Sequence, residues 1–350
     1  MNDLTSICPP SGDEKARVVV LGEVPGKEEV LNGENFSGPT GRILFEDHLG
    51  SAGISRSQCL VMNTYWERPP GGKFELIREP FKYEDQVMEL INSYPRDLII
   101  AIGDHALNML LGKLGIWKHR GSILRVPHVA NNCAILPMIH PAAWMRNKKQ
   151  EEGSSGLEYW VRVLGRMDAQ RAKQILAKPS LCDIKRKVFT YGRSVFEGRI
   201  QNLSPYQRLQ QELGEYSQAS VLSFDIESSG DDILCIGLAK SPASSTVIPF
   251  NGTFSRQEEV QLLRMVRDIL NGPSLKIAQN SDFDAQHLAR EFGIAIKNFW
   301  FDTMVAHALL EPEMAHDLDL LVSIYTLHPF YAEEKKNSQE DFWIYCGRDC

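Results

Sequence analysis

Four carboxylates in the second half of the chain have the chemistry of a divalent-metal site. Asp225 and Glu227 stand two apart in SVLSFDIESS, Asp284 follows in AQNSDFD, and Asp349 lies in IYCGRDC. Alternation along a strand points residues two apart to the same side of a sheet, where neighbouring carboxylates repel each other unless a cation holds them. Such oxygen ligands suit a pair of Mg²⁺ or Mn²⁺ ions, about 3.5 to 4 Å apart, that bind the attacking and leaving oxygens of a phosphodiester. The set predicts a metal-dependent nuclease.

The spacing of these residues resembles a known set of motifs. DxE on a first strand, NxxxD from Asn280 to Asp284, and YxxxD from Tyr345 to Asp349 resemble, in order, the three motifs of DEDD 3'-5' exonucleases of the tyrosine subclass (DEDDy). The resemblance implies an RNase H-like (DnaQ-like) α/β fold in which the four carboxylates hold two metal ions. It also implies that Tyr345 orients the attacking water and that Asn280 supports the second motif.

The stretch from Asp302 to Thr326 resembles the corresponding part of family A DNA polymerases, including phage enzymes. In that family its DTM and HDLDLL segments lie between the second and third motifs. The resemblance implies a proofreading domain that acts on single-stranded or frayed 3' ends of DNA, with a polymerase domain as the missing partner after Cys350. An RNA-directed nuclease of the RNase D kind is the alternative that these segments disfavour.

The first half of the chain carries an acid, an amide and an imidazole at the ends of apolar stretches. Glu23 follows ARVVVLG, Asn63 lies in QCLVMNTY, and His140 follows CAILPMI. The carboxyl ends of parallel strands meet at the edge where open α/β proteins place their ligand sites. The Gly-rich loop after the first stretch adds the aromatic ring of Phe36, but it has neither GxGxxG nor GKS/T, and Pro25 removes an N–H, so it predicts no phosphate cradle. The four groups suit a nucleobase.

Three separated motifs in this half resemble those of the uracil-DNA glycosylase superfamily, family 4 in particular. They are GEVPGKEE with NGENFSGPTG, then MNTYWERPPGG, then HPAAWMRN. The resemblance implies that Phe36 stacks on an extruded uracil, that Asn63 reads its polar edge, and that Glu23 positions water or the developing sugar cation. His140 would donate to the uracil oxygen as the base leaves. Uracil-containing DNA is the expected substrate, and flipping costs least in single strands or mismatches.

Two departures from the family pattern affect the expected chemistry. Family 4 enzymes carry an iron–sulfur cluster on four cysteines, whereas here Glu67 stands at one such position and Cys8 has no CxxC partner, so we expect no cluster. Val24 and Ser37 replace small and apolar neighbours of the pocket. They keep open a second interpretation, in which the glycosylase fold binds uracil or DNA, or docks the polymerase domain, without excising a base.

The order of predicted elements indicates two α/β domains. Apolar strand-like stretches alternate with amphipathic helical ones from residue 16 onward, which predicts a parallel sheet with helices on both faces. We expect a glycosylase-like α/β/α domain over residues 1–177, a linker with a helix over 178–215, and the exonuclease domain over 216–350. Ser204 and Pro205 have the residue types of an N-cap and a first helical position for the linker helix.

Composition excludes several classes of protein. Hydrophobic residues make up 43% and charged residues 24% of 350 residues, which are globular values, and no apolar run reaches the roughly 18 residues of a membrane span. The polar N-terminus is no secretory signal, so we expect a soluble protein in the cytoplasm of a bacterium or of a phage-infected host. Seven cysteines without a CxxC pair argue against a disulfide framework or a zinc ribbon. The net charge of −7 gives no basic surplus for nucleic acid, unless the acidic residues gather in a metal site.

Overall fold

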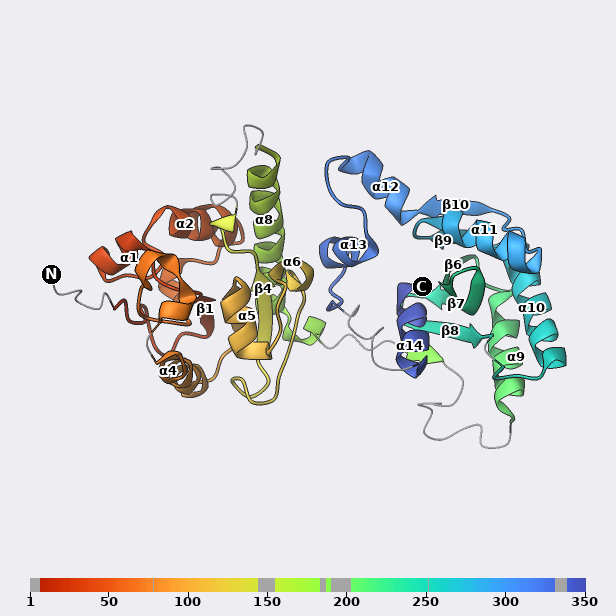
Figure 1. Ribbon diagram of the computed structural model, residues 1–350, viewed down its shortest axis with the longest axis horizontal. Coiled ribbons are helices and arrows are strands. Elements are labelled where there is room, and N and C mark those ends of the chain that lie inside the picture. The colour runs from red at the N-terminus through yellow and green to blue at the C-terminus, as the bar shows by residue number, and fades with distance from the viewer. Residues whose placement is uncertain are drawn as a thin grey trace. The chain divides into compact units, whose positions relative to one another are not determined.

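The chain forms two compact units of α/β structure, as predicted (Figure 1). The computed structural model describes residues 7–77, 79–143, 155–182, 187–189, 203–250, 252–330 and 339–350. Unit 1 consists of Met1–Ile184 and Val322–Phe330, and unit 2 of Lys185–Leu321 and Tyr331–Cys350. No helix in the described part of the chain is both long enough and apolar enough to cross a membrane.

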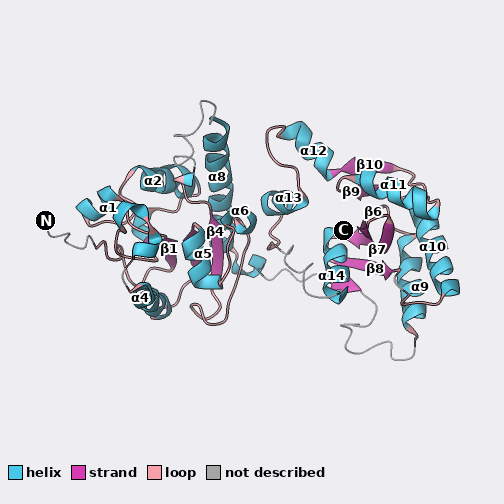
Figure 2. Cartoon of the chain, in the orientation of Figure 1, coloured by secondary structure: helices cyan, strands magenta, loops and turns pink. Residues whose placement is uncertain are grey.

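Unit 1 is built on a four-stranded parallel sheet in the order β2-β1-β3-β4. Figure 2 labels two of its strands, β1 and β4. Every residue of these strands is buried, which explains why their sequences are nearly continuous apolar runs rather than alternating ones. The strands are β1 (Val18–Gly22), β2 (Cys59–Asn63), β3 (Leu98–Ile102) and β4 (Ala134–Met138).

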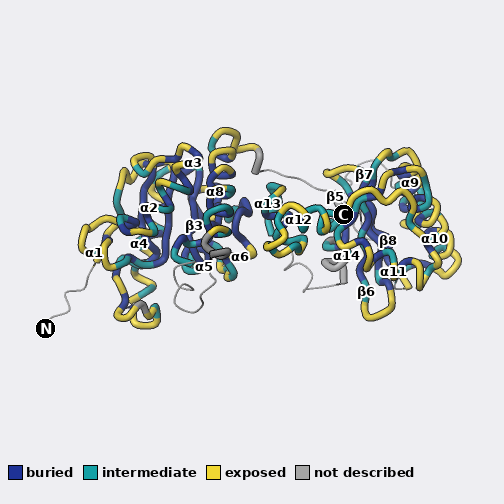
Figure 3. The backbone as a smooth tube through the Cα atoms, turned by 90° about the horizontal axis from the view of Figure 1, so that it is seen from above, coloured by how far each residue is buried: buried dark blue, intermediate teal, exposed yellow. Residues whose placement is uncertain are grey.

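Helices pack on both faces of this sheet. Val18 and Val20 of β1 belong to a core that includes side chains of η1 and α8, whereas Val19 and Leu21 belong to a second core with α4 and α5. The buried strands appear in dark blue in Figure 3. The helices are α1 (Lys27–Asn32), α2 (Pro39–Arg42), the π-helix η1 (Ile43–His48), α3 (Leu49–Ser51), α4 (Pro80–Asn92), α5 (Asp104–Leu111), α6 (Ile116–His119) and α8 (Ser155–Ala177), with 3₁₀ turns η2 (Arg56–Gln58), η3 (Pro70–Gly72), η4 (Phe74–Leu76) and η5 (Pro179–Cys182).

A late segment of the chain completes unit 1. Val322–Phe330 folds with the first half, although it lies between the second and third exonuclease motifs in sequence. The buried guanidinium of Arg120 pairs with Asp168 and donates from Nη1 to Ser323 Oγ at 2.9 Å. Arg171 donates to the main-chain oxygen of Ser323 at 2.9 Å. Nothing in the sequence pattern indicated this placement.

Unit 2 contains a six-stranded mixed sheet in the order β10-β9-β6-β7-β8-β5. β6, β7 and β8 are antiparallel neighbours, and they correspond to the three strand-like runs that open the predicted exonuclease domain. β9 and β10 extend the sheet in parallel beyond β6, and β5 pairs in parallel with β8. The strands are β5 (Lys187–Phe189), β6 (Val221–Ser229), β7 (Asp232–Ser241), β8 (Ser244–Pro249), β9 (Leu275–Ala278) and β10 (Phe299–Asp302).

Helices pack on both faces of this sheet. Phe224 and Ile226 enter the main core with side chains of α9, α10 and α11. On the opposite face, Cys235 of β7 packs with Cys346 of α14.

α9 begins as predicted, since Ser204 Oγ accepts from the main-chain N–H of Gln207 at 3.2 Å. The helices are α9 (Pro205–Tyr216), α10 (Arg256–Leu270), α11 (Ser281–Phe292), α12 (Thr303–Leu310), α13 (Leu318–Tyr325) and α14 (Gln339–Asp349).

Candidate functional sites

Three carboxylates converge in unit 2. Asp225 and Glu227 project from β6, and Asp349 is the last residue of α14, so that one oxygen of each lies within 4.8 Å of the others. Helix α14 can approach because the facing residue of β7 is Gly237, where a Cβ would lie 2.5 Å from Cys350 Sγ. The expected strand and the expected terminal helix therefore bring these three side chains together.

The three carboxylates form a strongly unfavourable arrangement in the absence of a cation. Burial raises the pKa of the Asp225 carboxyl well above its usual range, and the charges of Asp349, Asp284 and Glu227 raise it further. Among the described residues, Asp225 Oδ2 has no hydrogen-bond partner. A divalent cation would neutralise the repulsion and use the orphaned oxygen, so this donor set fits Mg²⁺ or Mn²⁺.

Asp284 lies beside this group rather than within it. Its side chain is 3% exposed, and its Oδ1 accepts a hydrogen bond at 3.0 Å from the main-chain N–H of Ile226, the residue between the two acids of β6. Burial raises the pKa of the Asp284 carboxyl to about 7, while hydrogen bonds from main-chain N–H groups act in the opposite direction. The contact ties α11 to the strand that carries the metal-ligand candidates.

The two remaining predicted residues of unit 2 differ in their surroundings. Tyr345 lies one turn before Asp349 on α14. Burial raises the pKa of its phenol above its usual range, with further increases from Asp349 and Asp319, so the phenol stays protonated. Asn280 is exposed at the N-cap of α11, and its main-chain N–H donates to Asp302 Oδ1 at 3.2 Å. The structure thus brings Tyr345 to the carboxylate group but places Asn280 beside the residue that caps α12.

Asp302 and Asp319 are residues that sequence reasoning named only as parts of longer stretches. Asp302 caps α12 by accepting from Met304 N at 2.8 Å, and it accepts from Ser281 N at 2.8 Å at the start of α11. It therefore fixes the ends of two helices. Its signal was available, because an Asp directly before a helical run is a common N-cap. The proximity of Asp319 to Tyr345 had no such local signal.

In unit 1 an amide and two rings meet at the carboxyl edge of the sheet. A Cβ at Gly22 would lie 2.4 Å from Asn63 Oδ1 and 2.5 Å from Phe36 Cζ, so both side chains rest on the last residue of β1. The His140 ring lies 6.0 Å from the Phe36 ring, with 27° between the two planes. Three of the four predicted pocket residues therefore share one location.

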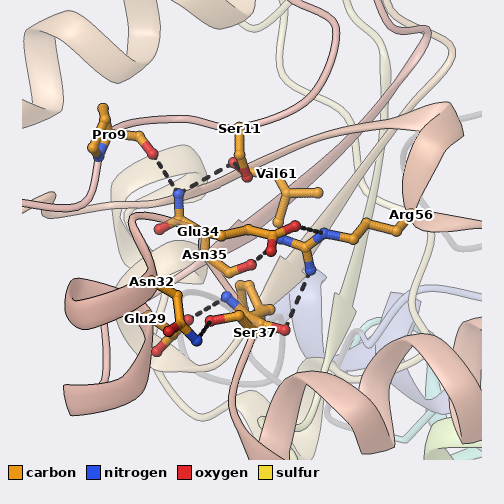
Figure 4. Close-up of polar contacts among 10 residues, drawn as sticks. Pro9, Ser11, Glu29, Asn32, Glu34, Asn35, Ser37, Arg56 and Val61 are labelled. Atoms are coloured by element: carbon orange, nitrogen blue, oxygen red, sulfur yellow. Dashed lines mark hydrogen bonds and ion pairs between the residues drawn. The ribbon is translucent and has the colours of Figure 1, made fainter.

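The main chain of Phe36 is held in an uncommon conformation. Its φ is 54°, in the left-handed region that non-glycine residues rarely adopt. Its N–H donates to Glu29 Oε1, and its carbonyl oxygen accepts from Arg56 Nη1 at 3.2 Å. Figure 4 labels the two side chains that make these contacts, Glu29 and Arg56. Backbone strain that surrounding contacts hold in place is concentrated at active sites and ligand clamps.

The hydrogen bonding of His140 fixes the position of its proton. Nδ1 accepts from the main-chain N–H of Ala142 at 3.0 Å. A ring nitrogen that accepts carries no hydrogen, so the neutral imidazole is protonated on Nε2. His140 is therefore a hydrogen-bond donor at Nε2, which is the property that the expected role requires.

Glu23 points along the sheet edge toward α5. It is 7% exposed, and its Oε1 accepts from the main-chain N–H of His105 at 3.3 Å, in the first turn of that helix. Gly103 (φ 92°) provides the space, because a Cβ there would lie 2.6 Å from the same oxygen. The first turn of α5 therefore orients the carboxyl group of Glu23.

Cys8 and Glu67, the two positions that bear on an iron–sulfur cluster, are both buried. Cys8 is completely buried and its N–H donates to Trp66 O at 2.8 Å, and Glu67 is 7% exposed. Within the described ranges, the only group of three or more side chains that could hold a metal ion is the carboxylate group of unit 2. The absence of a cluster remains a prediction.

The two halves of the chain are similar to two different groups of known proteins. Residues 9–163 match the model of the uracil DNA glycosylase superfamily, and residues 200–345 match a 3'-5' exonuclease model. The type-4 uracil-DNA glycosylase of Archaeoglobus fulgidus is 29% identical over 157 residues, which are 43% of this chain and 78% of the relative. That of Thermotoga maritima is 28% identical over 176 residues, which are 50% of this chain and 85% of the relative.

Two solved exonuclease domains are also similar. The EXD2 exonuclease domain, soaked in Mg and dGMP, is 17% identical with a TM-score of 0.25, covering 47% of this chain and 83% of its own. The Nibbler EXO domain of Aedes aegypti is 11% identical with a TM-score of 0.29, covering 40% of this chain and 77% of its own.

Proposed function

We propose that this chain, which joins a uracil-DNA glycosylase superfamily domain to a 3'-5' exonuclease domain, is a DNA-processing hydrolase with two separate centres. The observation that carries the proposal is the convergence of Asp225, Glu227 and Asp349 within the exonuclease-type unit. The substrate of this centre is the single-stranded or frayed 3' end of DNA, which is shortened from its terminus.

The exonuclease centre works with divalent cations held by its three clustered carboxylates together with Asp284. Two such ions, when bound, would activate the attacking water and offset charge on the phosphate. Tyr345, whose phenol remains protonated, orients the water by a hydrogen bond, as in the tyrosine subclass. Asp284 also holds α11 against β6 through its hydrogen bond with Ile226. The metal ligands therefore keep their spacing while the 3' end of the DNA moves through the site.

A magnesium-dependent assay tests this half directly. Wild-type protein should shorten a 5'-labelled single strand from its 3' end, and Asp225→Asn should lower the rate at least about a hundredfold, because the electrostatic contribution to the transition state is lost. Asp282→Asn is the matched control, because Asp282 is an exposed acid in the first turn of α11. Equal activity of Asp225→Asn and wild type would remove the assignment.

The exonuclease is proposed to belong to a family A DNA polymerase. The support is the stretch from Asp302 to Thr326, in which Asp302 caps α12 and the HDLDLL segment leads into α13. The test is the coding sequence that follows Cys350. Polymerase motifs in the same reading frame would support the parent protein, and a stop codon directly after Cys350 would contradict it.

Unit 1 is proposed to excise uracil. The base stacks on Phe36 and is read by Asn63, and the C1'–N1 bond breaks with its electron pair passing to the base. The Nε2–H of His140 donates to the uracil oxygen on which the charge develops, and Glu23 stabilises the sugar cation that water then attacks. A donor aimed at developing charge contributes about 3 to 4 kcal/mol. His140→Ala should therefore slow single-turnover uracil release about a hundred- to a thousandfold, whereas His128→Ala, at an exposed histidine, should not.

A second candidate function has its own supporting observation. Phe36 is 3% and Asn63 1% exposed, so the pocket must open before a base can stack there. A unit that binds DNA outside this pocket, or that docks a polymerase domain, would need no such opening. Saturable binding of uracil-containing DNA without base release favours binding alone, and indifference to uracil favours docking.

A further inference from the structure

Two buried side-chain amides face each other beside the expected base pocket. Asn35 is completely buried, Asn63 is 1% exposed, and Asn63 Nδ2 donates to Asn35 Oδ1 at 2.8 Å. Where water is excluded, each polar atom depends on the protein atom opposite to it. The orientation of one amide therefore decides the orientation of the other.

Main-chain oxygens decide the orientation of Asn35. Its Nδ2 donates to Pro9 O at 2.6 Å and to Val61 O at 3.5 Å, as Figure 4 shows. A carbonyl oxygen only accepts, so the amide group near these two atoms must be the NH₂ of Asn35. The oxygen of Asn35 is thus the atom that faces Asn63.

The backbone around Asn35 is held as well. Arg56 donates from Nη2 to the main-chain oxygen of Asn35 and from Nη1 to that of Phe36 at 3.2 Å, and its Nε lies 2.8 Å from Glu34 Oε1. The same guanidinium therefore positions the amide and the stacking ring. This leaves Asn35 little freedom to follow a rotation of Asn63.

The orientation of Asn63 follows from that of Asn35. Because an acceptor faces it, Asn63 must turn its NH₂ toward Asn35 and its Oδ1 away. A Cβ at Gly22 would lie 2.4 Å from that oxygen and 2.5 Å from Phe36 Cζ, so the oxygen and the ring edge border the same residue of β1. The acceptor of Asn63 is therefore on the side of the stacking ring.

A carboxamide of fixed orientation distinguishes uracil from cytosine. Uracil offers an N3–H donor beside the O4 acceptor, and cytosine offers an N3 acceptor beside a 4-amino donor. An Asn63 acceptor next to its second N–H matches uracil, and the same group turned by 180° matches cytosine. In that turned state the side-chain oxygens of Asn35 and Asn63 would face each other where water is excluded. The turned state would therefore carry the free-energy cost of a buried acceptor without a hydrogen bond.

We propose that Asn35 locks the carboxamide of Asn63 and so makes the pocket select uracil over cytosine. The inference rests on the proposed glycosylase function and adds to it a residue that determines base specificity. Asn35 acts through Asn63 and is a positioning residue.

The test compares two substitutions in the same loop. Asn35→Leu has nearly the same shape but neither donor nor acceptor, and the control Asn32→Leu removes an exposed amide that donates to Ser37 Oγ at 3.2 Å. Binding is measured with single strands that carry one uracil or one cytosine, in a His140→Ala background that keeps the base attached. The ratio of the cytosine to the uracil Kd should fall about ten- to a hundredfold in Asn35→Leu, because one buried hydrogen bond no longer opposes the turned state. It should not change in Asn32→Leu.

A rescue variant separates specificity from folding. Asn35→Asp, protonated in its buried position, keeps an oxygen toward Asn63 and an O–H toward Pro9 O, so it should keep the uracil preference. Asn35→Ala serves as a second removal of the acceptor if Asn35→Leu fails to fold. A merely structural role of Asn35 would alter stability in all three variants without altering the ratio.

The outcomes of the two proposals are distinguishable. Uracil release by wild type together with an unchanged Kd ratio in folded Asn35→Leu overturns the lock alone. Wild-type protein that neither releases uracil nor prefers it to cytosine overturns the glycosylase proposal and the lock with it.

Discussion

Asp284 Oδ1 accepts a hydrogen bond at 3.0 Å from the main-chain N–H of Ile226, the residue that separates Asp225 from Glu227 on β6. One carboxylate thus has two tasks: a structural one through this hydrogen bond and a proposed metal-binding one through its charge. Substitutions can separate them.

Asp284→Asn should keep the structural contact and lose the charge. The asparagine oxygen still accepts from Ile226, so the melting temperature should change little while the exonuclease rate falls about a hundredfold. Asp284→Ala should lose the same activity and also about 1 to 3 kcal/mol of unfolding free energy, because a buried N–H is left without a partner. Exonuclease assays and thermal unfolding check both. Full activity of Asp284→Asn would contradict the metal-binding role.

Arg120 binds the late segment of unit 1, so we expect its substitution to lower the unfolding free energy strongly. Arg120→Met removes the ion pair of the buried Asp168 and the bond to Ser323, so unfolding should become easier by about 3 to 5 kcal/mol. The control is Arg162→Met, whose ion pair with Asp47 is partly exposed and contributes about 1 kcal/mol or less. Denaturant unfolding monitored in unit 1 measures both. Equal losses in the two variants would show that the segment is not part of the core.

His48 predicts a pH dependence of the stability of unit 1. It is completely buried beside Gly165, its ring nitrogens have no hydrogen-bond partner among the described residues, and burial lowers its pKa to about 4. Between about 6.5 and 4 the unfolded chain binds more protons at this position than the folded chain does, so the unfolding free energy falls as pH falls. The slope should approach about 1.4 kcal/mol per pH unit from this group.

Chemical denaturation between pH 7 and pH 4.5 measures that slope. His48→Leu should flatten it, since the buried titrating group is gone, and His128→Leu, at an exposed histidine, should leave it unchanged. A slope that survives in His48→Leu would assign the pH dependence to other groups.

The prediction of no iron–sulfur cluster is tested by elemental analysis. Cys8 is buried against the main chain of Trp66, and Glu67 stands where the family has a cysteine, so purified protein should contain no stoichiometric iron. Iron that is bound in equimolar amount and lost in Cys8→Ser would contradict the prediction.

The sequence predicted the parts of each site that local patterns determine. Buried apolar runs predict one strand that ends at Asn63 and another that ends shortly before His140. Alternation along β6 puts Asp225 and Glu227 on one face. Both features follow from the geometry of a single strand. Two family models then match the two halves that the motifs had indicated.

What the sequence could not predict are contacts between distant positions. Asn35 and Asn63 are 28 residues apart, and Arg120 and Ser323 are 203 residues apart. A buried Asn or Ser has no periodic signature, because its partner is chosen by the tertiary fold. The specificity lock and the late segment of unit 1 therefore became visible only in the folded chain.

We propose that one chain carries two independent hydrolytic centres, of which only one needs a divalent metal. One oligonucleotide tests it: a 5'-labelled single strand with one internal uracil, incubated with wild type, Asp225→Asn and His140→Ala, each with Mg²⁺ or with a chelator. Abasic sites and 3' shortening are scored on the same gel.

Two independent centres should give 3' shortening that disappears with the chelator and in Asp225→Asn, and abasic sites that persist in both but disappear in His140→Ala. Loss of both products in either single variant, or uracil release that needs the metal, would contradict two independent centres.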